Sequence, residues 1–221
     1  TSAWLDGEKL GDHRGGYTPF EFEITDRVAF DQNQSLVLRV DDTPHPFKLE
    51  DKQGYGPARG LWQTAYLECR GASALKFLHF IPDIDRAAVT VHGRLLEPAP
   101  QPLTLTVSWE EAAGSRSQTV KKIKKGQSEL SFTVLLAQPH LWSLDDPYLY
   151  EVTATLAGNQ AVDTVRTYFG MRKISVTPLP GASHPYIALN NRPIYLQLAL
   201  DQAYHEQGFY TYESDAFMRD E

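Results

Sequence analysis

A long polar loop in the first part of the chain holds side chains suited to binding hydroxyl groups. The loop covers residues 41–57 and includes Glu50, Asp51, Gln53 and Tyr55. Carboxylates and amides match the paired donors and acceptors of a sugar, and an aromatic ring offers a platform for its apolar face. Loops longer than about 12 residues in a compact domain are usually functional or disordered. We therefore expect Asp51 and Gln53 to contact a ligand; the alternative is a polar loop capped by its own carboxylates.

The remaining motifs give no catalytic centre within these residues. Adjacent acid pairs at 41–42, 110–111 and 145–146 lie beside turns or strand ends, where solvated carboxylates are expected. Neither a G-x-S-x-G nucleophile elbow nor a glycine-rich phosphate loop occurs. The 7 histidines are scattered singly, and a zinc site at Cys69 would need partners that it lacks. We expect no catalytic residue, no metal and no cofactor here, and we expect Cys69 to be a small strand or core residue.

Composition argues against several kinds of partner. The formal net charge of -7 gives little support to nucleic-acid binding. The basic run KKIKK at 121–125 is typical of a solvated strand edge or a loop rather than of a binding patch. No apolar run reaches the length of about 18 residues that a membrane span needs. No signal peptide is visible, which slightly favours a cytoplasmic location but says little for a chain that begins without Met. Oligomerisation is left open.

Short alternating segments joined by turns indicate a mainly β protein, and 221 residues are enough for one large or two ordinary domains. A β-hairpin is predicted where the alternating runs 148–156 and 162–168 flank Gly158-Asn159. Together with other runs this gives about seven short strands over roughly 100 residues, which favours an immunoglobulin-like sandwich. The other predicted strands are 75–81, 89–93, 103–109 and 130–134.

The two ends of the chain add further predicted elements. Strands are predicted at 3–5 and 36–40, with Asp6-Gly7 as a hairpin turn, and at 17–24, where Phe20, Phe22 and Ile24 alternate with polar residues.

Near the other end, the Pro, Gly, Ser and Ala content of 178–185 predicts a linker, and 190–193 predicts a turn. An apolar strand is expected at 194–200, followed by the start of a helix with Ser214 as its N-cap. A strand, a loop and a helix in this order begin a β/α unit.

Three stretches resemble a known enzyme family. AWLDGEKLGDHRGGYTPFEFEITDRV at 3–28 is similar to the sugar-binding domain of family 2 glycoside hydrolases. LWSLDDPYLYEV at 141–152 and VDTVRTYFGMRKI at 162–174 resemble the closing strands of that family's immunoglobulin-like domain. The resemblance implies part of a jelly-roll sugar-binding domain at 1–70, an immunoglobulin-like β-sandwich at 71–177, and a linker with the start of a (β/α)8 barrel at 178–221. The earlier strands of the jelly roll would then precede residue 1.

The resemblance also implies an activity. The family includes β-galactosidases, β-glucuronidases and β-mannosidases, and we expect the non-catalytic part of a retaining, β-galactosidase-like enzyme acting on terminal β-glycosides. Its two catalytic glutamates would stand in later barrel strands, outside this sequence. The alternative is a stand-alone carbohydrate-binding or adhesion module made of β-sandwiches. Residues 194–221 favour the enzyme, because a binding module has no reason to end with a buried-type strand and a helix start.

A second set of candidate residues follows the expected barrel strand. Chemistry in such barrels gathers at the C-terminal ends of the strands. This position makes Asp201, Gln202, Tyr204 and His205 candidates for the substrate rim, and we expect them to converge with the loop that carries Asp51 and Gln53. The alternative is that Asp201 caps the loop and Tyr204 packs.

The sequence departs from the family at this point. Better-known members carry Asn and His where Leu200 and Gln202 stand, so the substrate assignment of those members does not transfer directly. The aromatic residues Trp142 and Tyr150 belong to the predicted hairpin region, and we expect them to pack in a core or between domains rather than to bind ligand.

Overall fold

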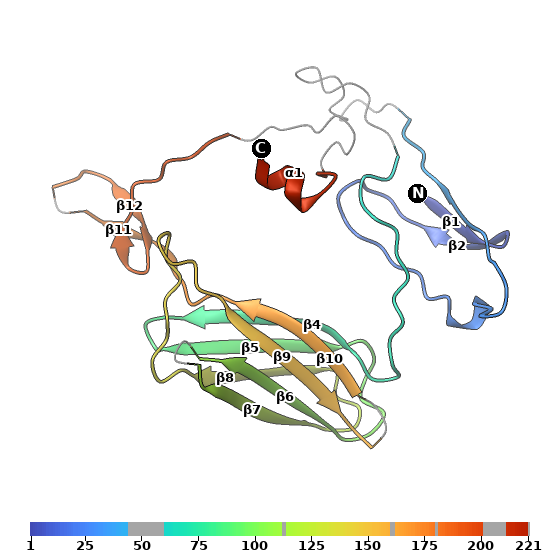
Figure 1. Cartoon of the computed structure of the whole chain (residues 1–221), viewed down its shortest axis with the longest axis horizontal. Helices are drawn as coiled ribbons and strands as arrows, with labels where there is room; N and C mark the ends of the chain where they lie inside the picture. Colours follow the sequence, from blue (N-terminus) through green and yellow to red (C-terminus); the bar gives the residue numbers. More distant parts are fainter. Residues whose placement is uncertain (44–59, 112–113, 160–161, 180, 201–210, 221) are drawn as a thin grey trace. The chain divides into compact units, whose positions relative to one another are not determined.

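The computed structural model describes residues 1–43, 60–111, 114–159, 162–179, 181–200 and 211–220. The chain divides into two compact units, Thr1–Tyr66 with Ala199–Glu221, and Leu67–Leu198. Each unit is considered by itself (Figure 1). Across the described residues, no helix has the length and apolar character needed to cross a membrane.

The first unit is built on a small antiparallel sheet. Strands β1 (Ser2–Leu5), β2 (Glu8–Asp12) and β3 (Leu36–Arg39) lie in the order β2-β1-β3. The predicted turn at Asp6 and Gly7 is confirmed, with φ of 49° and 87°. The Asp6 carboxylate accepts the Ser35 N–H at 2.7 Å, and this bond together with one from Gln34 lowers the pKa of Asp6. The turn is therefore tied to the start of β3.

Two short helices complete the described part of this unit. A 3-10 turn, η1, covers Thr25–Arg27, and the helix α1 covers Asp215–Asp220. The Ser214 hydroxyl accepts the Phe217 N–H at 3.1 Å, as an N-cap does at the third helical residue. The predicted N-cap is confirmed.

Two strand predictions in this region are wrong. Residues 17–24 form no strand, although Phe20, Phe22 and Ile24 alternate. The Phe20 ring instead stacks on His13 at 4.4 Å and meets Phe22 edge-on at 5.7 Å. Cys69, expected to be a small strand or core residue, is exposed, and residues 66–70 around it form no strand. A strand needs a neighbour to pair its backbone, and no described strand lies along either segment.

The second unit contains the predicted sandwich. Seven strands form two antiparallel sheets, β4-β5-β8 and β10-β9-β6-β7, among the described residues (Figure 1). This confirms the mainly β fold class and the hairpin around Gly158, whose strands β9 and β10 pair in register. The strands are β4 (Leu75–Asp83), β5 (Ala88–Leu95), β6 (Leu103–Glu110), β7 (Arg116–Ile123), β8 (Glu129–Leu135), β9 (Tyr150–Ala157) and β10 (Val162–Phe169).

Period-two burial fills the space between the sheets. Every second residue of β6 and β9 is buried, and the polar residues between them are not. The basic run begins on β7, the outer strand of its sheet, which agrees with the predicted strand edge. Lys122 donates to the Thr104 hydroxyl of β6 at 3.0 Å, and Lys121 lies over the Phe132 ring. The inward residues of β6 and β9 are Leu103, Leu105, Val107, Trp109, Tyr150, Val152, Ala154 and Leu156.

A small third sheet follows the sandwich and corrects the linker prediction. Strand β11 (Ile174–Pro178) pairs with β12 (Pro185–Leu189), which pairs with β13 (Arg192–Pro193). The segment predicted as a linker is therefore the loop of a hairpin. Residues 194–200 form no strand, because no described neighbour continues the ladder beyond the bond from Ile194 N–H to the Ile187 carbonyl at 2.9 Å. The start of a barrel stays a prediction.

The turn between β12 and β13 fastens this sheet to the sandwich. Asn190 and Asn191 both have left-handed φ, 50° and 66°. The Asn190 side chain accepts the Lys173 N–H at 3.0 Å and donates to the Trp142 carbonyl at 2.9 Å, both partly buried. Asn191 donates to Asp85 at 2.6 Å in an exposed position, and Lys173 forms an ion pair with the same carboxylate. These two bonds lower the pKa of Asp85, with the lysine the larger cause.

Tyr150 lies at the centre of the sandwich core. Its side chain is 0% exposed, stacks on Phe169 at 4.8 Å and meets Tyr148 edge-on at 5.0 Å. Its hydroxyl accepts the His140 N–H at 2.7 Å. The predicted packing role of Tyr150 is confirmed.

Removing the Tyr150 side chain should strongly destabilise the sandwich. We expect Tyr150→Ala to lower the free energy of unfolding by about 3–5 kcal/mol, because a buried aromatic leaves a cavity. Tyr150→Phe should cost about 1–3 kcal/mol by leaving the His140 N–H without its partner. Urea unfolding of the 221-residue chain measures both. The exposed Tyr168→Phe on β10 serves as the control, and an unchanged midpoint in Tyr150→Ala would contradict the assignment.

Substitution of the two asparagines of the β12–β13 turn should lower the free energy of unfolding by different amounts. Replacement by Gly keeps the left-handed backbone available, so only the side-chain bonds are lost. We expect Asn190→Gly to cost about 1–3 kcal/mol, since it leaves a partly buried N–H and a carbonyl unpaired. Asn191→Gly should cost less than about 1 kcal/mol, because its one bond is exposed. Equal costs in chemical unfolding would show that the turn conformation, not the Asn190 side chain, holds the sheet.

Candidate functional site

The six residues predicted for the substrate rim lie outside the described residues. Their contacts with a sugar stay a prediction. The structure does describe the segments on either side of the two sets, and it shows what ties those segments together. The six are Asp51, Gln53, Asp201, Gln202, Tyr204 and His205.

Trp62 joins three segments of the first unit. Its indole Nε1–H donates to the Gly16 carbonyl at 2.7 Å, and the Tyr17 ring stands 6.0 Å away at a 58° tilt. Its own carbonyl accepts the Thr211 hydroxyl at 2.7 Å. The bond to Gly16 lies in an exposed position and orients the indole ring.

The Trp62–Thr211 bond brings together the flanks of the two candidate sets. Thr211 is the first described residue after 201–210, and Trp62 follows 44–59 by three positions. Gln53 is nine residues from Trp62, and His205 is six residues from Thr211. The sequence gave no sign of this contact, whose partners are 149 positions apart.

The entry to the first loop is a local turn. The Asp41 carboxylate accepts both the hydroxyl and the N–H of Thr43, at 2.6 and 3.2 Å. These bonds lower the pKa of Asp41, with the hydroxyl the larger cause. Asp41 therefore caps the start of the loop. This agrees, for this residue, with the alternative that the loop is capped by its own carboxylates.

The other adjacent acid pairs also have structural partners. Asp146 bonds the His140 imidazole at 2.5 Å, and its carbonyl accepts the Ser143 N–H at 2.9 Å, which closes a turn. Glu111 accepts the Trp109 indole N–H at 2.8 Å at the end of β6. No group of three or more His, Cys, Asp or Glu side chains within the described ranges is placed to hold a metal ion.

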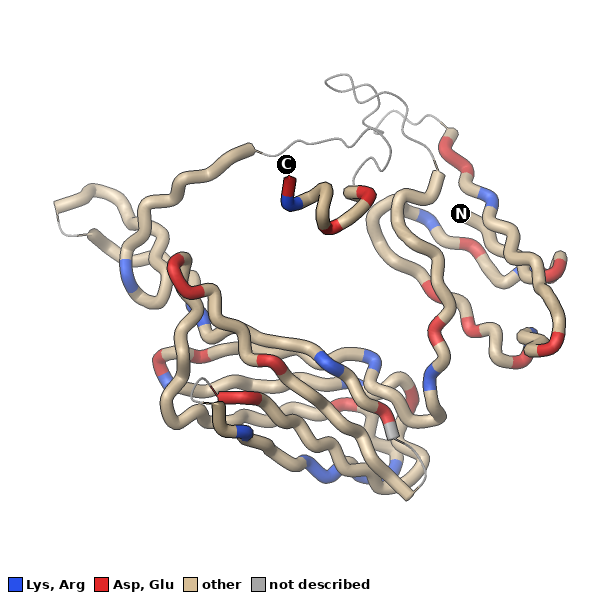
Figure 2. Tube along the Cα trace, viewed as in Figure 1, with Lys and Arg blue, Asp and Glu red and all other residues tan. Residues whose placement is uncertain are grey.

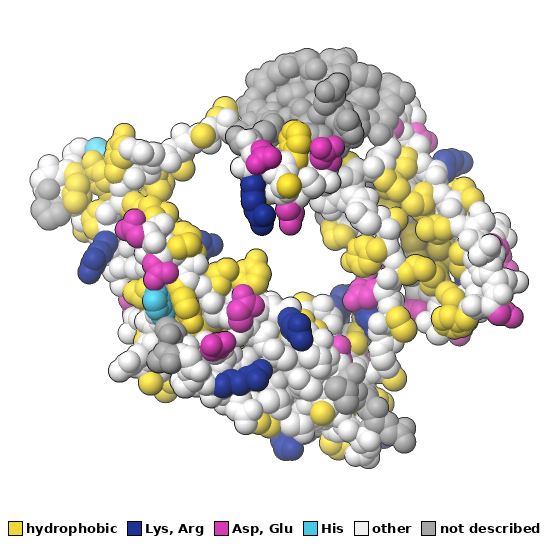
Figure 3. Space-filling model, in the orientation of Figure 1, with side chains coloured by type: hydrophobic (Ala, Val, Ile, Leu, Met, Phe, Trp, Pro, Cys, Tyr) yellow, Lys and Arg dark blue, Asp and Glu magenta, His cyan; other side chains and the backbone are white. Residues whose placement is uncertain are grey.

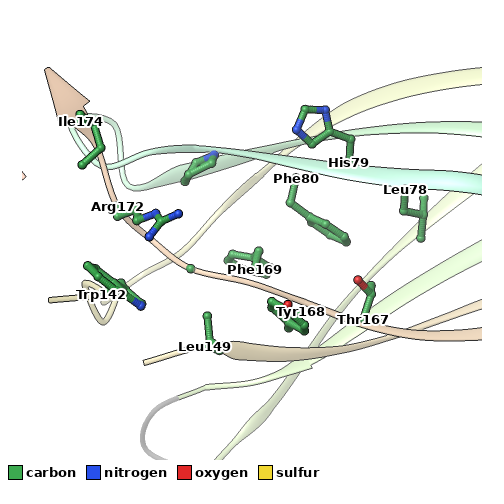
Figure 4. A pocket seen from close by; sticks show the side chains of 12 residues that line it. Leu78, His79, Phe80, Trp142, Leu149, Thr167, Tyr168, Phe169, Arg172 and Ile174 are labelled. Atoms are coloured by element: carbon green, nitrogen blue, oxygen red, sulfur yellow. The ribbon is translucent and has the colours of Figure 1, made fainter. Parts of the chain in front are cut away.

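The sandwich carries an open recess of about 540 Å³ beside the edges of β4 and β10 (Figure 4). Phe80 and Phe169, whose rings stack at 5.3 Å, lie within it, and the Arg172 guanidinium stands 4.9 Å from the Trp142 ring. Trp142 thus packs against a cation, in line with the packing role expected of it. No carboxylate lines the recess, so it offers no acid–base pair. Its lining is Leu78, His79, Phe80, Pro82, Trp142, Leu149, Thr167, Tyr168, Phe169, Gly170, Arg172 and Ile174.

Known proteins resemble this chain at the level of sequence. Residues 75–172 match the model of glycosyl hydrolases family 2. A β-galactosidase of Thermoanaerobacter pseudethanolicus is 27% identical over 191 residues, which cover 77% of this chain and 24% of that protein. A β-glucuronidase of Bacteroides fragilis is 25% identical over 199 residues, covering 80% of this chain and 28% of that protein.

Solved structures share the fold. A β-glucuronidase of Parabacteroides merdae gives a TM-score of 0.66 at 17% identity, with 89% of this chain and 26% of that chain covered. An exo-chitosanase of Amycolatopsis orientalis gives 0.66 at 20% identity, with 87% and 25% covered.

The chain therefore spans about a quarter of the length of the relatives that it matches. The matched region is the seven-strand sandwich from β4 to β10, with the residues up to Arg172 that lead out of it. Over residues 75–172 the chain is therefore similar to family 2 of the glycosyl hydrolases, and it shares its fold with the solved structures.

Proposed function

We propose that these residues form the non-catalytic N-terminal and central part of a longer, β-galactosidase-like enzyme. That enzyme would hydrolyse terminal β-glycosides with retention of configuration. The similarity to a β-galactosidase extends over 77% of this chain but over 24% of the relative, which supports a longer polypeptide. Carbohydrate would then reach this part only as the substrate of the whole enzyme.

The described carboxyl groups with a shifted pKa show no candidate for the protonated general acid. Retaining hydrolysis needs two carboxyl groups about 5–5.5 Å apart, one of which must hold a proton near neutral pH. Among the described carboxyl groups, those with a clearly shifted pKa are shifted downward, chiefly by hydrogen bonds to neighbouring donors. A lowered pKa keeps a carboxylate ionised, which is the reverse of what a general acid needs. These groups are Asp6, Asp12, Asp41, Glu68 and Asp85.

The observation that carries a role at the substrate is the Trp62–Thr211 hydrogen bond. It joins the segments that flank the two polar candidate sets within one compact unit. We assign Asp51, Gln53, Asp201 and Gln202, with Tyr204 and His205, to a rim that binds sugar hydroxyls. Binding energy from hydroxyls remote from the reacting bond can orient that bond, so the rim would affect rate as well as affinity.

The 221-residue chain alone should not hydrolyse glycosides. We expect no turnover of a panel of nitrophenyl β-glycosides, including galactoside and glucuronide, because both catalytic carboxyl groups would be supplied by the rest of the polypeptide. The longer polypeptide, purified in the same way, is the positive control. Turnover by the short chain that a point substitution within it abolishes would contradict the non-catalytic role.

Rim substitutions should lower the activity of the longer polypeptide. We expect Asp51→Asn and Asp201→Asn each to reduce kcat/KM about tenfold, since a lost partner for a buried polar group costs on the order of 1–3 kcal/mol. Asp31→Asn, an exposed turn carboxylate of the same unit, serves as the control and should leave kcat/KM unchanged. Circular dichroism and melting curves check that the fold is intact.

The double variant tests whether the two sets share one rim. Substitutions at separate sites add in free energy, whereas residues that contact the same ligand give a coupling of about 0.5–3 kcal/mol. We expect Asp51→Asn and Asp201→Asn to be non-additive in kcat/KM. Wild-type kinetics in both single variants would exclude the rim, and strict additivity would place the two carboxylates at separate sites.

A further inference from the structure

The recess on the second unit lies where the sandwich is open between its two sheets. β4 ends one sheet and β10 ends the other, so each of these strands pairs with only one neighbour among the described strands. Small-molecule sites have volumes of this order, about 540 Å³, and are usually lined by apolar side chains with a few polar groups. The lining has that composition, and none of the six rim candidates belongs to it.

The floor of the recess consists of packed aromatic rings. Phe80 and Phe169 stack at 5.3 Å, and Phe169 stacks in turn on Tyr150 at 4.8 Å, so the floor continues into the core. Figure 4 shows Phe80 and Phe169 directed into the recess from β4 and β10. By contrast, hydrophobic side chains are few and lie apart over β6, β7 and β9 in Figure 3. Because the core holds the two rings, this apolar surface exists before any ligand binds.

One cation stands at the end of this apolar floor. The Arg172 guanidinium lies over the Trp142 ring, 4.9 Å from its centre, and Figure 4 shows both side chains at the same end of the recess. The structure shows no hydrogen bond or ion pair from this guanidinium to any residue that it describes. A cation–π contact leaves the N–H donors of arginine available. Trp142 therefore positions Arg172, which can still bind an anion through two parallel hydrogen bonds.

The lining of the recess has donors but no negative charge. Acidic residues occur elsewhere on the sandwich, as Figure 2 shows, but none is among the twelve residues that line the recess. The Trp142 indole N–H is a further donor without a hydrogen-bond partner among the described residues. Figure 4 shows the His79 ring on the other side of β4 from Phe80, so Arg172 is the cation directed at the floor. A site with an unpaired cation and no carboxylate favours an anion.

We propose that the recess binds an aromatic carboxylate, with the carboxylate on Arg172 and the ring on the floor formed by Phe80 and Phe169. Charge complementarity selects the anion, and the fork of the guanidinium matches the two oxygens of a carboxylate. The floor selects an aromatic ring over a sugar acid, because sugar hydroxyls would lose water against phenylalanine without gaining partners. Such binding needs neither the catalytic carboxyl groups nor the longer polypeptide.

The test measures the binding of three probes to the 221-residue chain at low salt. 2-Naphthoate carries both the ring and the charge, 2-naphthamide carries the ring alone, and glucuronate carries the charge on a sugar ring. We expect 2-naphthoate to bind with a dissociation constant below about 1 mM, and about tenfold or more tightly than either other probe, because charge-assisted hydrogen bonds are roughly twice as strong as neutral ones. Isothermal titration calorimetry measures all three affinities.

Two arginine substitutions show whether the anion lies in the recess. Arg172→Gln removes the charge that faces the floor. Arg166→Gln is the matched control, because Arg166 is exposed and stands opposite Thr153, whereas the next residue of β10 stands opposite the buried Val152. We expect Arg172→Gln to weaken 2-naphthoate about tenfold or more and to leave 2-naphthamide within about twofold, since the amide does not use the charge. Arg166→Gln should change neither affinity, and melting curves check that both variants fold.

Several outcomes would overturn the proposal. Equal affinities for 2-naphthoate and 2-naphthamide, or no binding of 2-naphthoate at millimolar concentration, would show that the recess reads no carboxylate. Glucuronate binding as tightly as 2-naphthoate would show that the site takes a sugar acid, and equal losses in Arg172→Gln and Arg166→Gln would place the anion outside the recess. If Arg172→Gln does not fold, Arg172→Lys decides: it keeps the charge without the planar fork, so it must still prefer 2-naphthoate to 2-naphthamide but bind it more weakly than the wild type.

Discussion

The pairing of β9 between β6 and β10 is the constraint on which the rest of the second unit depends. Leu156 stands opposite Leu105, and Ala154 opposite Val107, so one register sets the inward residues of both strands. A slip of a single residue would turn the Tyr150 side chain outward and bury Thr153 and Thr155 without their solvent contacts. Exposing the Tyr150 ring and burying the two threonine hydroxyls would both cost free energy. The alternation along β9 therefore specifies the register of its whole sheet.

A short series of hydrogen bonds connects this sheet to the small sheet β11–β12–β13. The Tyr150 hydroxyl holds the backbone of His140, and the neighbouring Trp142 N–H donates to the Met171 carbonyl at 2.9 Å. The Trp142 carbonyl then accepts Asn190. Each bond contributes only about 0.5–1.5 kcal/mol, but each would leave a partly buried polar group unpaired if broken. The position of the small sheet on the sandwich therefore follows from the core that β9 organises.

Backbone pairing also explains which elements could be predicted from the sequence. The alternating runs between residues 75 and 169 became strands because each has a neighbour within the same unit. The run 17–24 alternates equally well, yet alternation reports only one-sided burial and says nothing about a partner strand. Strand β7 was recognised only as a strand edge or loop, because lysines mask its period.

The hairpin around 178–185 was missed because its loop has the composition of a linker. Pro, Gly and Ser are common in linkers and in hairpin loops alike, so they cannot separate the two. The apolar alternation in ISVTP and PYIAL, followed by two asparagines able to adopt left-handed φ, was the informative feature. For the candidate site, residue types indicated sugar contacts, but the bond between Trp62 and Thr211 depends on tertiary folding that no local pattern encodes.

The first unit anchors the chain at both ends of the segment between β3 and Trp62. The first candidate loop leaves β3 through the Asp41 turn and returns at Trp62, which is fixed to Gly16 and to Thr211. The entropic cost of closing so long a loop grows only with the logarithm of its length. Folding meets that cost at the anchors. The described residues of the first unit thus fix the chain on both sides of the segment that carries Asp51 and Gln53.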